Sequence, residues 1–183
     1  SIMKELKDSS LQPKLQTMHH NANQLRSLVN HLLDFRKLEM GGERLSLSRG
    51  NISEFVNSMV VSFKDAAQKS GISISFEDSM ENPMMAFDNL QMQKIVNNLL
   101  SNALKFTPEG GFINVTLTSD ESRDMILEVS DTGIGIPEHD LPHIFDRFYR
   151  SDNTELRTGS GIGLSLVKQY AEMHGGSISV KSE

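Results

Sequence analysis

Two asparagines and a lysine, Asn98, Asn102 and Lys105, recur at helical spacing within one short stretch of this chain. Positions four apart in a helix share a face, so the two amides would lie side by side, with Lys105 near them one turn further on. Amide oxygens suit a hard cation such as Mg²⁺, and an ammonium group suits phosphate. The pattern favours a metal-bound phosphate ligand, although asparagines on an exposed helix face are also common.

A first glycine turn follows a segment of alternating apolar residues. Asp131 comes directly after that segment, and Gly133 and Gly135 follow in the order Asp-x-Gly-x-Gly. Glycine adopts the conformations of such a turn at little cost. A carboxylate at the end of a strand can accept a hydrogen bond from the amino group of an adenine, so Asp131 is a candidate for recognising a base.

A second glycine run precedes a predicted helix. It comprises Gly159, Gly161 and Gly163, followed by Leu164. Free backbone N–H groups at the start of a helix suit a chain of phosphates. The dinucleotide fingerprint Gly-x-Gly-x-x-Gly fails because Glu138 and Leu166 stand where the third glycine of each run would be. The P-loop sequence Gly-Lys-Ser/Thr is also absent from the chain.

Length and composition exclude several classes of protein. With 183 residues, the chain suits one domain, or one domain with a small appendage. A net charge of −6 argues against non-specific binding of nucleic acid. Because there are no cysteines, disulfides, thiolate catalysis and cysteine zinc sites are excluded, as expected of a cytosolic protein. No apolar run reaches the roughly 20 residues that cross a bilayer, no leader opens the chain, and both ends look like those of a fragment.

The N-terminal part predicts one long helix over residues 11–40, closed by Gly41 and Gly42. Residues 1–6 look like the tail of an earlier helix. The apolar positions of the long helix follow a heptad seam: Leu11, Leu15, Met18, Ala22, Leu25, Val29 and Leu32. So wide an apolar face needs a partner, which is either another subunit or another part of this chain.

The remaining residues predict a mixture of strands and helices. The expected elements are a strand at 45–47, a helix at 54–69 capped by Ser53, strands at 72–76 and 84–87, a helix at 88–105 capped by Asp88, an antiparallel pair at 113–117 and 125–129, a helix at 162–173 and a strand at 177–180. Strands and helices segregated in this way predict an α+β fold, a two-layer α/β sandwich with helices over one face of the sheet.

The segment between the glycine runs carries aromatic and basic residues. Phe145, Phe148 and Tyr149 are expected to be apolar anchors, with Arg147 and Arg150 beside them. Plain core packing explains the two phenylalanines equally well. The polar stretch 151–158 predicts a mobile lid over a ligand.

Together, four stretches resemble the ATP-binding domain of sensor histidine kinases, within the superfamily that includes DNA gyrase, Hsp90 and MutL. They are residues 98–105, 131–135, 144–150 and 159–164, and the resemblance covers about residues 10 to 183. It implies a Bergerat-type ATP-binding fold over 43–183. It also implies that residues 1–42 are part of a dimerisation hairpin, mainly its second helix, because Asn30 to Glu39 matches the usual end of that helix.

The resemblance also implies roles for individual residues. Asn102 would be the Mg²⁺ ligand supported by Asn98, Asp131 would recognise adenine, and Lys105 and Arg150 would meet the phosphates. Gly133 and Gly135 would let the backbone approach the base, and Gly159, Gly161, Gly163 and Leu164 would hold the nucleotide. The catalytic residues implied are Asn98, Lys105 and Arg150, with Arg157 a weaker candidate.

The position of Asn98 distinguishes between two kinds of chemistry. Relatives that hydrolyse ATP with water carry a glutamate there as general base, and an amide has no comparable basicity. Asn98 therefore favours phosphoryl transfer to histidine over hydrolysis.

The chain's own histidines are not expected to accept the phosphoryl group. The family's acceptor lies on the first hairpin helix, and His19 and His20 lack the residues that flank it. The other histidines have no paired carboxylate or metal-binding spacing and are expected to be structural or solvated; they are His31, His139, His143 and His174.

The sequence thus predicts the C-terminal catalytic fragment of a two-component sensor histidine kinase. It would bind Mg-ATP and transfer the γ-phosphoryl group to a histidine outside the fragment, for signalling to a response regulator. The intact protein would be a homodimer through the N-terminal helix, and this part would be the cytosolic portion of a membrane-bound sensor. Two alternatives stay open: an ATPase module of the chaperone or topoisomerase kind, and a non-catalytic dimerisation scaffold with a relic nucleotide site.

Overall fold

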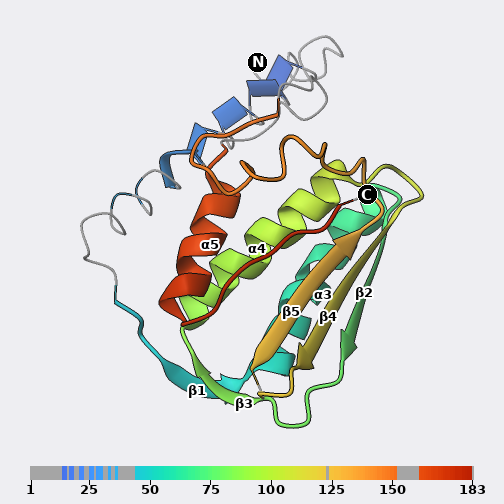
Figure 1. The fold of residues 1–183 in the computed structure, drawn as a ribbon. Coiled ribbons are helices and arrows are strands. Elements are labelled where there is room, and N and C mark those ends of the chain that lie inside the picture. Colours follow the sequence, from blue (N-terminus) through green and yellow to red (C-terminus); the bar gives the residue numbers. More distant parts are fainter. Residues whose placement is uncertain are drawn as a thin grey trace, which may run out of the picture.

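The computed structural model describes residues 44–122, 124–151 and 161–182, with scattered positions between 14 and 36 (Figure 1). The described positions between 14 and 36 are helical, which agrees with the predicted long helix. Its expected end at Gly41 and Gly42, the earlier helix at 1–6, and the histidines His19, His20 and His31 lie outside the described residues.

Two small sheets and three helices make up the described part from residue 44 onward. Strand β4 (Phe112–Ser119) is the centre of a three-stranded sheet, parallel to β2 (Ser73–Asp78) and antiparallel to β5 (Met125–Asp131). Strands β1 (Ser48–Asn51) and β3 (Met84–Phe87) form a separate antiparallel pair. The helices are α3 (Ile52–Lys69), α4 (Asn89–Phe106) and α5 (Gly163–Met173).

The core lies between the larger sheet and the helices. Strand β4 alternates as its sequence predicts, with Ile113, Val115 and Leu117 fully buried. The helices bury one apolar stripe each: Val56, Met59 and Val60 of α3, Met92, Ile95, Val96, Leu100 and Ala103 of α4, and Leu166, Val167 and Tyr170 of α5. Helices cover one face of the sheet (Figure 1), so the predicted two-layer α+β fold is confirmed.

Helix α4 begins where the sequence predicts because Asp88 caps it. The Asp88 carboxylate accepts hydrogen bonds from the backbone N–H groups of Leu90 and Gln91. Burial alone would raise the pKa of Asp88, but bonds from the N–H groups of Gln91, Ser46 and Leu90 outweigh it and hold that pKa below its usual value. The cap therefore fixes the first residue of the helix that carries the asparagines.

Two predictions near the start of this domain were wrong. The strand expected at 45–47 instead occupies Ser48–Asn51, because Ser46 donates its N–H to the Asp88 carboxylate at 2.7 Å and so cannot pair in a sheet. Ser53 does not cap α3, since it is buried within the helix. Asn51 is the cap and accepts a hydrogen bond from the Glu54 N–H.

The strand predicted at 177–180 is also wrong. Residues 177–182 keep the predicted alternation of exposed and half-buried side chains, and they run beside β5 (Figure 1). However, no strand is assigned there, because a strand needs a ladder of backbone hydrogen bonds and none of these residues forms one within the described ranges. This segment instead forms a hydrogen bond through a side chain: Ile136 donates its N–H to the Ser182 hydroxyl at 2.7 Å.

Helices α4 and α5 pack side by side and run in opposite directions. At one end, His174 after α5 accepts the Asp88 N–H on Nε2 at 3.2 Å. Its Nδ1 therefore carries the hydrogen and donates to the Tyr170 carbonyl at 2.7 Å. Midway, Lys94 donates to the buried Tyr170 hydroxyl at 3.0 Å. His174 is thus structural, as the sequence analysis predicted. None of the described helices combines the length and apolar character needed to span a membrane.

We predict that His174→Ala lowers the free energy of unfolding by about 1–3 kcal/mol, because the Asp88 N–H loses its acceptor at a buried helix start. Urea denaturation followed by circular dichroism measures the change. Glu172→Ala is the matched control, since that side chain is exposed at the end of α5, the helix that His174 follows. Equal stability of the two variants would show that the His174 bridge contributes nothing.

Candidate functional site

The three polar residues singled out on α4 lie toward its C-terminal end. Asn98 and Asn102 are half-buried and Lys105 is exposed. The Asn98 Nδ2 donates to the Lys94 carbonyl one turn earlier, at 2.8 Å. This bond fixes the amide, so its Oδ1 is left to face away from the α4 backbone.

The Asn98 amide oxygen faces the first residue of α5. A β-carbon placed on Gly163 would lie 2.6 Å from the Asn98 Oδ1, closer than β-carbons approach other atoms in proteins. The second glycine run therefore meets the asparagine helix directly. Leu164 is the next residue of α5 and is half-buried.

The turn after β5 also meets α4. Asp131 is exposed at the end of β5, and its Oδ1 accepts the Gly133 N–H at 2.8 Å. Ile134 donates its N–H to the carbonyl of Phe106, the last residue of α4, at 3.2 Å. Gly135 completes the turn with a φ of 70°. The carboxylate predicted to read adenine is thus held beside the helix of the asparagines.

Lys105, near the C-terminal end of α4, is influenced by a second cation. Partial desolvation of the ammonium and then the positive charge of Arg150 lower the pKa of Lys105. The Lys105 Nζ also lies 4.3 Å from the centre of the Phe106 ring. Two neighbouring positive charges repel each other, so an anion placed between them would be bound favourably.

The aromatic segment meets the second glycine run through the backbone. Phe148 donates its N–H to the Gly161 carbonyl at 2.9 Å. Gly161 has a φ of 68°, and a β-carbon there would lie 2.6 Å from the Tyr149 carbonyl oxygen, so only glycine fits. Gly159, Arg157 and the predicted lid beyond Ser151 lie outside the described residues.

Two predictions about residues 139–149 need correction. Phe148 is 58% exposed rather than core, and its φ of 61° is unusual for a residue with a side chain. His143 and His139 do have carboxylate partners, Asp146 at 2.9 Å and Asp140 at 3.3 Å. His143 and Asp146 are three residues apart in the sequence, and this spacing could have predicted that they pair.

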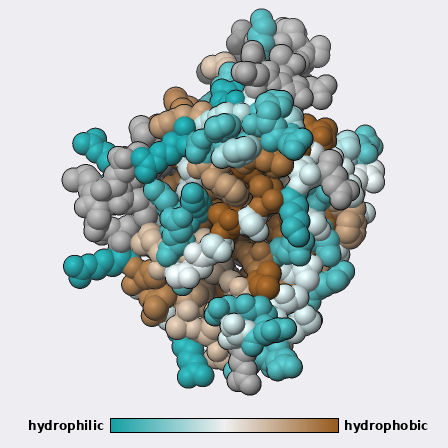
Figure 2. All heavy atoms as spheres, in the orientation of Figure 1, coloured by the Kyte–Doolittle hydropathy of each residue, from teal (hydrophilic) through white to brown (hydrophobic). Residues whose placement is uncertain are grey.

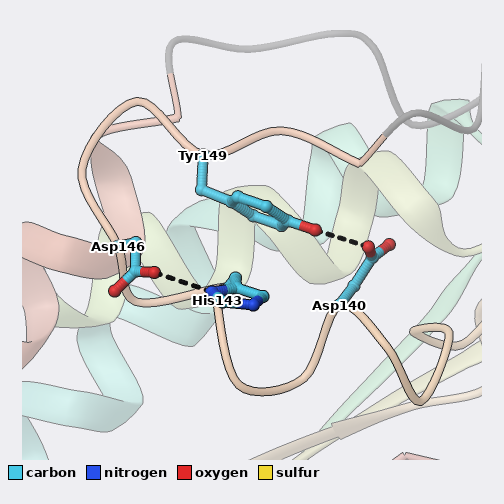
Figure 3. Close-up of polar contacts among 4 residues, drawn as sticks. All are labelled: Asp140, His143, Asp146 and Tyr149. Atoms are coloured by element: carbon cyan, nitrogen blue, oxygen red, sulfur yellow. Dashed lines mark hydrogen bonds and ion pairs between the residues drawn. The ribbon is translucent and has the colours of Figure 1, made fainter.

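A polar cluster around Tyr149 was not predicted from the sequence. Its hydroxyl donates to the buried carboxylate of Asp140, and its ring lies 5.3 Å from the ring of His143 (Figure 3). No motif predicted this cluster, because a phenol–carboxylate pair nine positions apart follows no helical or strand spacing.

The donor set suits Mg²⁺ better than a transition metal. Within the described ranges, no group of three or more histidines, aspartates or glutamates could hold a metal ion. Amide oxygens on α4, with one aimed at the start of α5, match a cation that takes few protein ligands. Figure 2 shows hydrophobic side chains gathered in the centre of the face seen in Figure 1, framed by hydrophilic ones. An apolar surface with a polar rim is typical of a small-molecule site.

The comparison with known proteins agrees with this geometry. Residues 87–183 match the family described as histidine kinase-, DNA gyrase B-, and HSP90-like ATPase. The chain is 35% identical over 170 residues to histidine kinase P4 of Formosa agariphila, which covers 90% of this chain and 12% of that protein. It is 35% identical over 165 residues to the sensor protein SrrB of Staphylococcus aureus, covering 88% of this chain and 28% of that protein.

A solved structure shares the fold over nearly the whole chain. Full-length ShkA in complex with AMPPNP superposes with a TM-score of 0.82 at 27% identity, covering 96% of this chain and 36% of that one. The chain thus spans well under half the length of each of these three proteins. The match over residues 87–183 agrees with the four motifs and with their meeting around α4. The chain therefore belongs to the family of histidine kinase-, DNA gyrase B- and HSP90-like ATPases.

Proposed function

We propose that this chain binds Mg-ATP where α4, α5 and the turn after β5 meet. In the intact protein, it would deliver the γ-phosphoryl group to a histidine outside the chain. The observation that carries the proposal is the approach of the Asn98 amide oxygen to Gly163, because it joins the helix of the candidate metal ligand, Asn102, to the glycine run suited to phosphates.

Different residues would bind the two ends of the nucleotide, the phosphate chain and the adenine. Asn102, supported by Asn98, would hold Mg²⁺, which when bound neutralises charge on the phosphates. Lys105 and Arg150 would face the phosphates, since their proximity leaves positive charge to be neutralised. The second glycine run with Leu164 would hold the phosphate chain, and Asp131 with Gly133 and Gly135 would bind adenine.

The chemistry that this site supports is transfer to an imidazole. The bond from phosphorus to the ADP oxygen would break as a bond to the histidine nitrogen forms. Because the Asn98 amide is not basic and its Nδ2 is already bonded to Lys94, it cannot activate water. Catalysis would therefore rest on positioning and on neutralising charge, through Lys105 and Arg150.

The N-terminal helix supports a dimeric assembly of the intact protein. Its described apolar side chains are exposed: Leu15, Met18, Leu25, Leu28, Val29 and Leu33. We propose that residues 1–42 belong to a dimerisation hairpin and residues 43–183 to the catalytic domain. A response regulator would receive the phosphoryl group, and any membrane attachment would be through other parts of the protein.

We predict that calorimetric titration shows ATP binding that depends on Mg²⁺ and weakens when the metal is chelated. Asp131→Asn should lower the affinity for ATP about tenfold or more, because a neutral amide replaces the charged acceptor. Asn102→Ala should weaken binding only when Mg²⁺ is present. Asn97→Ala, on the same helix, is the matched control.

GTP provides a further test of the adenine assignment. The parent chain should prefer ATP to GTP, and Asp131→Asn should reduce that preference, since guanine presents a carbonyl where adenine presents an amino group. Failure of the parent chain to bind ATP at millimolar concentration would contradict the proposed function and favour a relic site.

We predict that the chain alone neither hydrolyses ATP steadily nor becomes phosphorylated. It lacks a general base at Asn98, and the acceptor histidine lies outside it. Phosphate release and retention of label from γ-labelled ATP measure the two activities. Sustained release of phosphate would favour the ATPase alternative, whereas acid-labile label on the chain would implicate His19 or His20.

A further inference from the structure

Residues 137–149 form a succession of turns that share their backbone groups. The N–H groups of Asp140, His143, Asp146 and Tyr149 donate to the carbonyls of Pro137, Asp140, His143 and Asp146, at 2.9, 2.8, 2.7 and 3.4 Å. Asp140, His143 and Asp146 are therefore each both a donor and an acceptor. This repeated bonding holds a segment that has no helix or strand of its own.

The side chain of Asp140 ties the end of this segment to its beginning. Asp140 is 2% exposed, and the Tyr149 hydroxyl donates to its Oδ1 at 2.5 Å (Figure 3). Hydrogen bonds from Ser151 and then Tyr149 hold the pKa of Asp140 below its usual value, and the nearby imidazoles of His139 and His143 act in the same direction. The two residues that flank Arg150 thus bind one buried carboxylate.

The two residues before Arg150, Phe148 and Tyr149, are also held in place by contacts with other parts of the chain. Phe148 is held with a positive φ by its N–H bond to the Gly161 carbonyl. The ring of Tyr149 lies against His143, whose Nδ1 lies 2.9 Å from the Asp146 carboxylate. Arg150 is exposed within this fixed frame, and its charge acts on Lys105.

We propose that Asp140 is a positioning residue, which holds Tyr149 and Ser151 so that Arg150 points toward Lys105 and the phosphates of the nucleotide. Asp140 does not touch the nucleotide itself. The proposal rests on the proposed function only in that Lys105 and Arg150 are taken to bind phosphate. The alternative is that the Asp140–Tyr149 bond stabilises the fold and nothing more.

Binding experiments separate these two roles. Tyr149→Phe removes one hydroxyl and should lower the affinity for Mg-ATP about three- to tenfold, without changing the affinity for adenosine, which has no phosphates. Asp140→Asn should act in the same direction. In an Arg150→Ala background, Tyr149→Phe should have no further effect, because the residue through which it acts is gone.

Ser75→Ala is the matched control. It deletes a half-buried hydroxyl that donates to the Asn114 side chain at 2.7 Å, between β2 and β4. Its stability should fall while its preference for ATP over adenosine stays at the parent value. If Tyr149→Phe behaves like this control, or if its loss adds fully to that of Arg150→Ala, the positioning role is overturned.

A second readout needs no nucleotide. NMR titration of the Lys105 side chain should show its pKa rising in Arg150→Ala, because a neighbouring positive charge is removed. Tyr149→Phe should also raise the pKa of Lys105, whereas Ser75→Ala should not. An unchanged pKa of Lys105 in Tyr149→Phe would overturn the proposal even if ATP binds. Failure of the parent chain to bind ATP, with the pKa shift present, would instead contradict only the proposed function.

Discussion

Helices α4 and α5 are joined at both ends and in the middle, and the candidate site depends on this antiparallel packing. At one end, His174 accepts the Asp88 N–H, and midway Lys94 bonds Tyr170. At the other end, the Asn98 amide oxygen reaches the start of α5. Because the first two contacts fix the position of α5 along α4, they also determine which α4 side chain meets the glycine run. The candidate site therefore lies at the end of the helix pair where α5 begins.

A second constraint is electrostatic. Lys105 and Arg150 come from distant parts of the chain, and their mutual repulsion lowers the pKa of Lys105 after desolvation has already done so. An anionic ligand would relieve this repulsion, which links the stability of this corner to what it binds. The buried carboxylate of Asp140 belongs to the same arrangement, because it holds both residues that flank Arg150.

Local elements followed closely from the sequence. Strand β3 matches its predicted bounds, Asp88 caps α4, and β4 alternates as expected, because capping and side-chain period act over a few residues. The strand predictions failed where the backbone groups of a segment do not form the hydrogen bonds of a sheet, because residues distant in the sequence bond to that segment in another way. Ser46 donates to Asp88 instead of joining a strand, and residues 177–182 alternate without a backbone ladder. The alternation of side chains indicates which face of a segment is buried, but it does not indicate which residues form hydrogen bonds with its backbone.

The sequence by itself determined the residue types and spacings able to bind a metal-bound phosphate compound, since Asn98, Asn102, Lys105, Asp131 and the glycine runs are local motifs. Only the tertiary structure decided that these motifs meet, that Phe148 is exposed, and that a Tyr149–Asp140 bond stands beside Arg150. The physical reason is that such contacts arise from how α5 packs on α4 and how the turns of 137–149 close. No spacing within a single element encodes either arrangement.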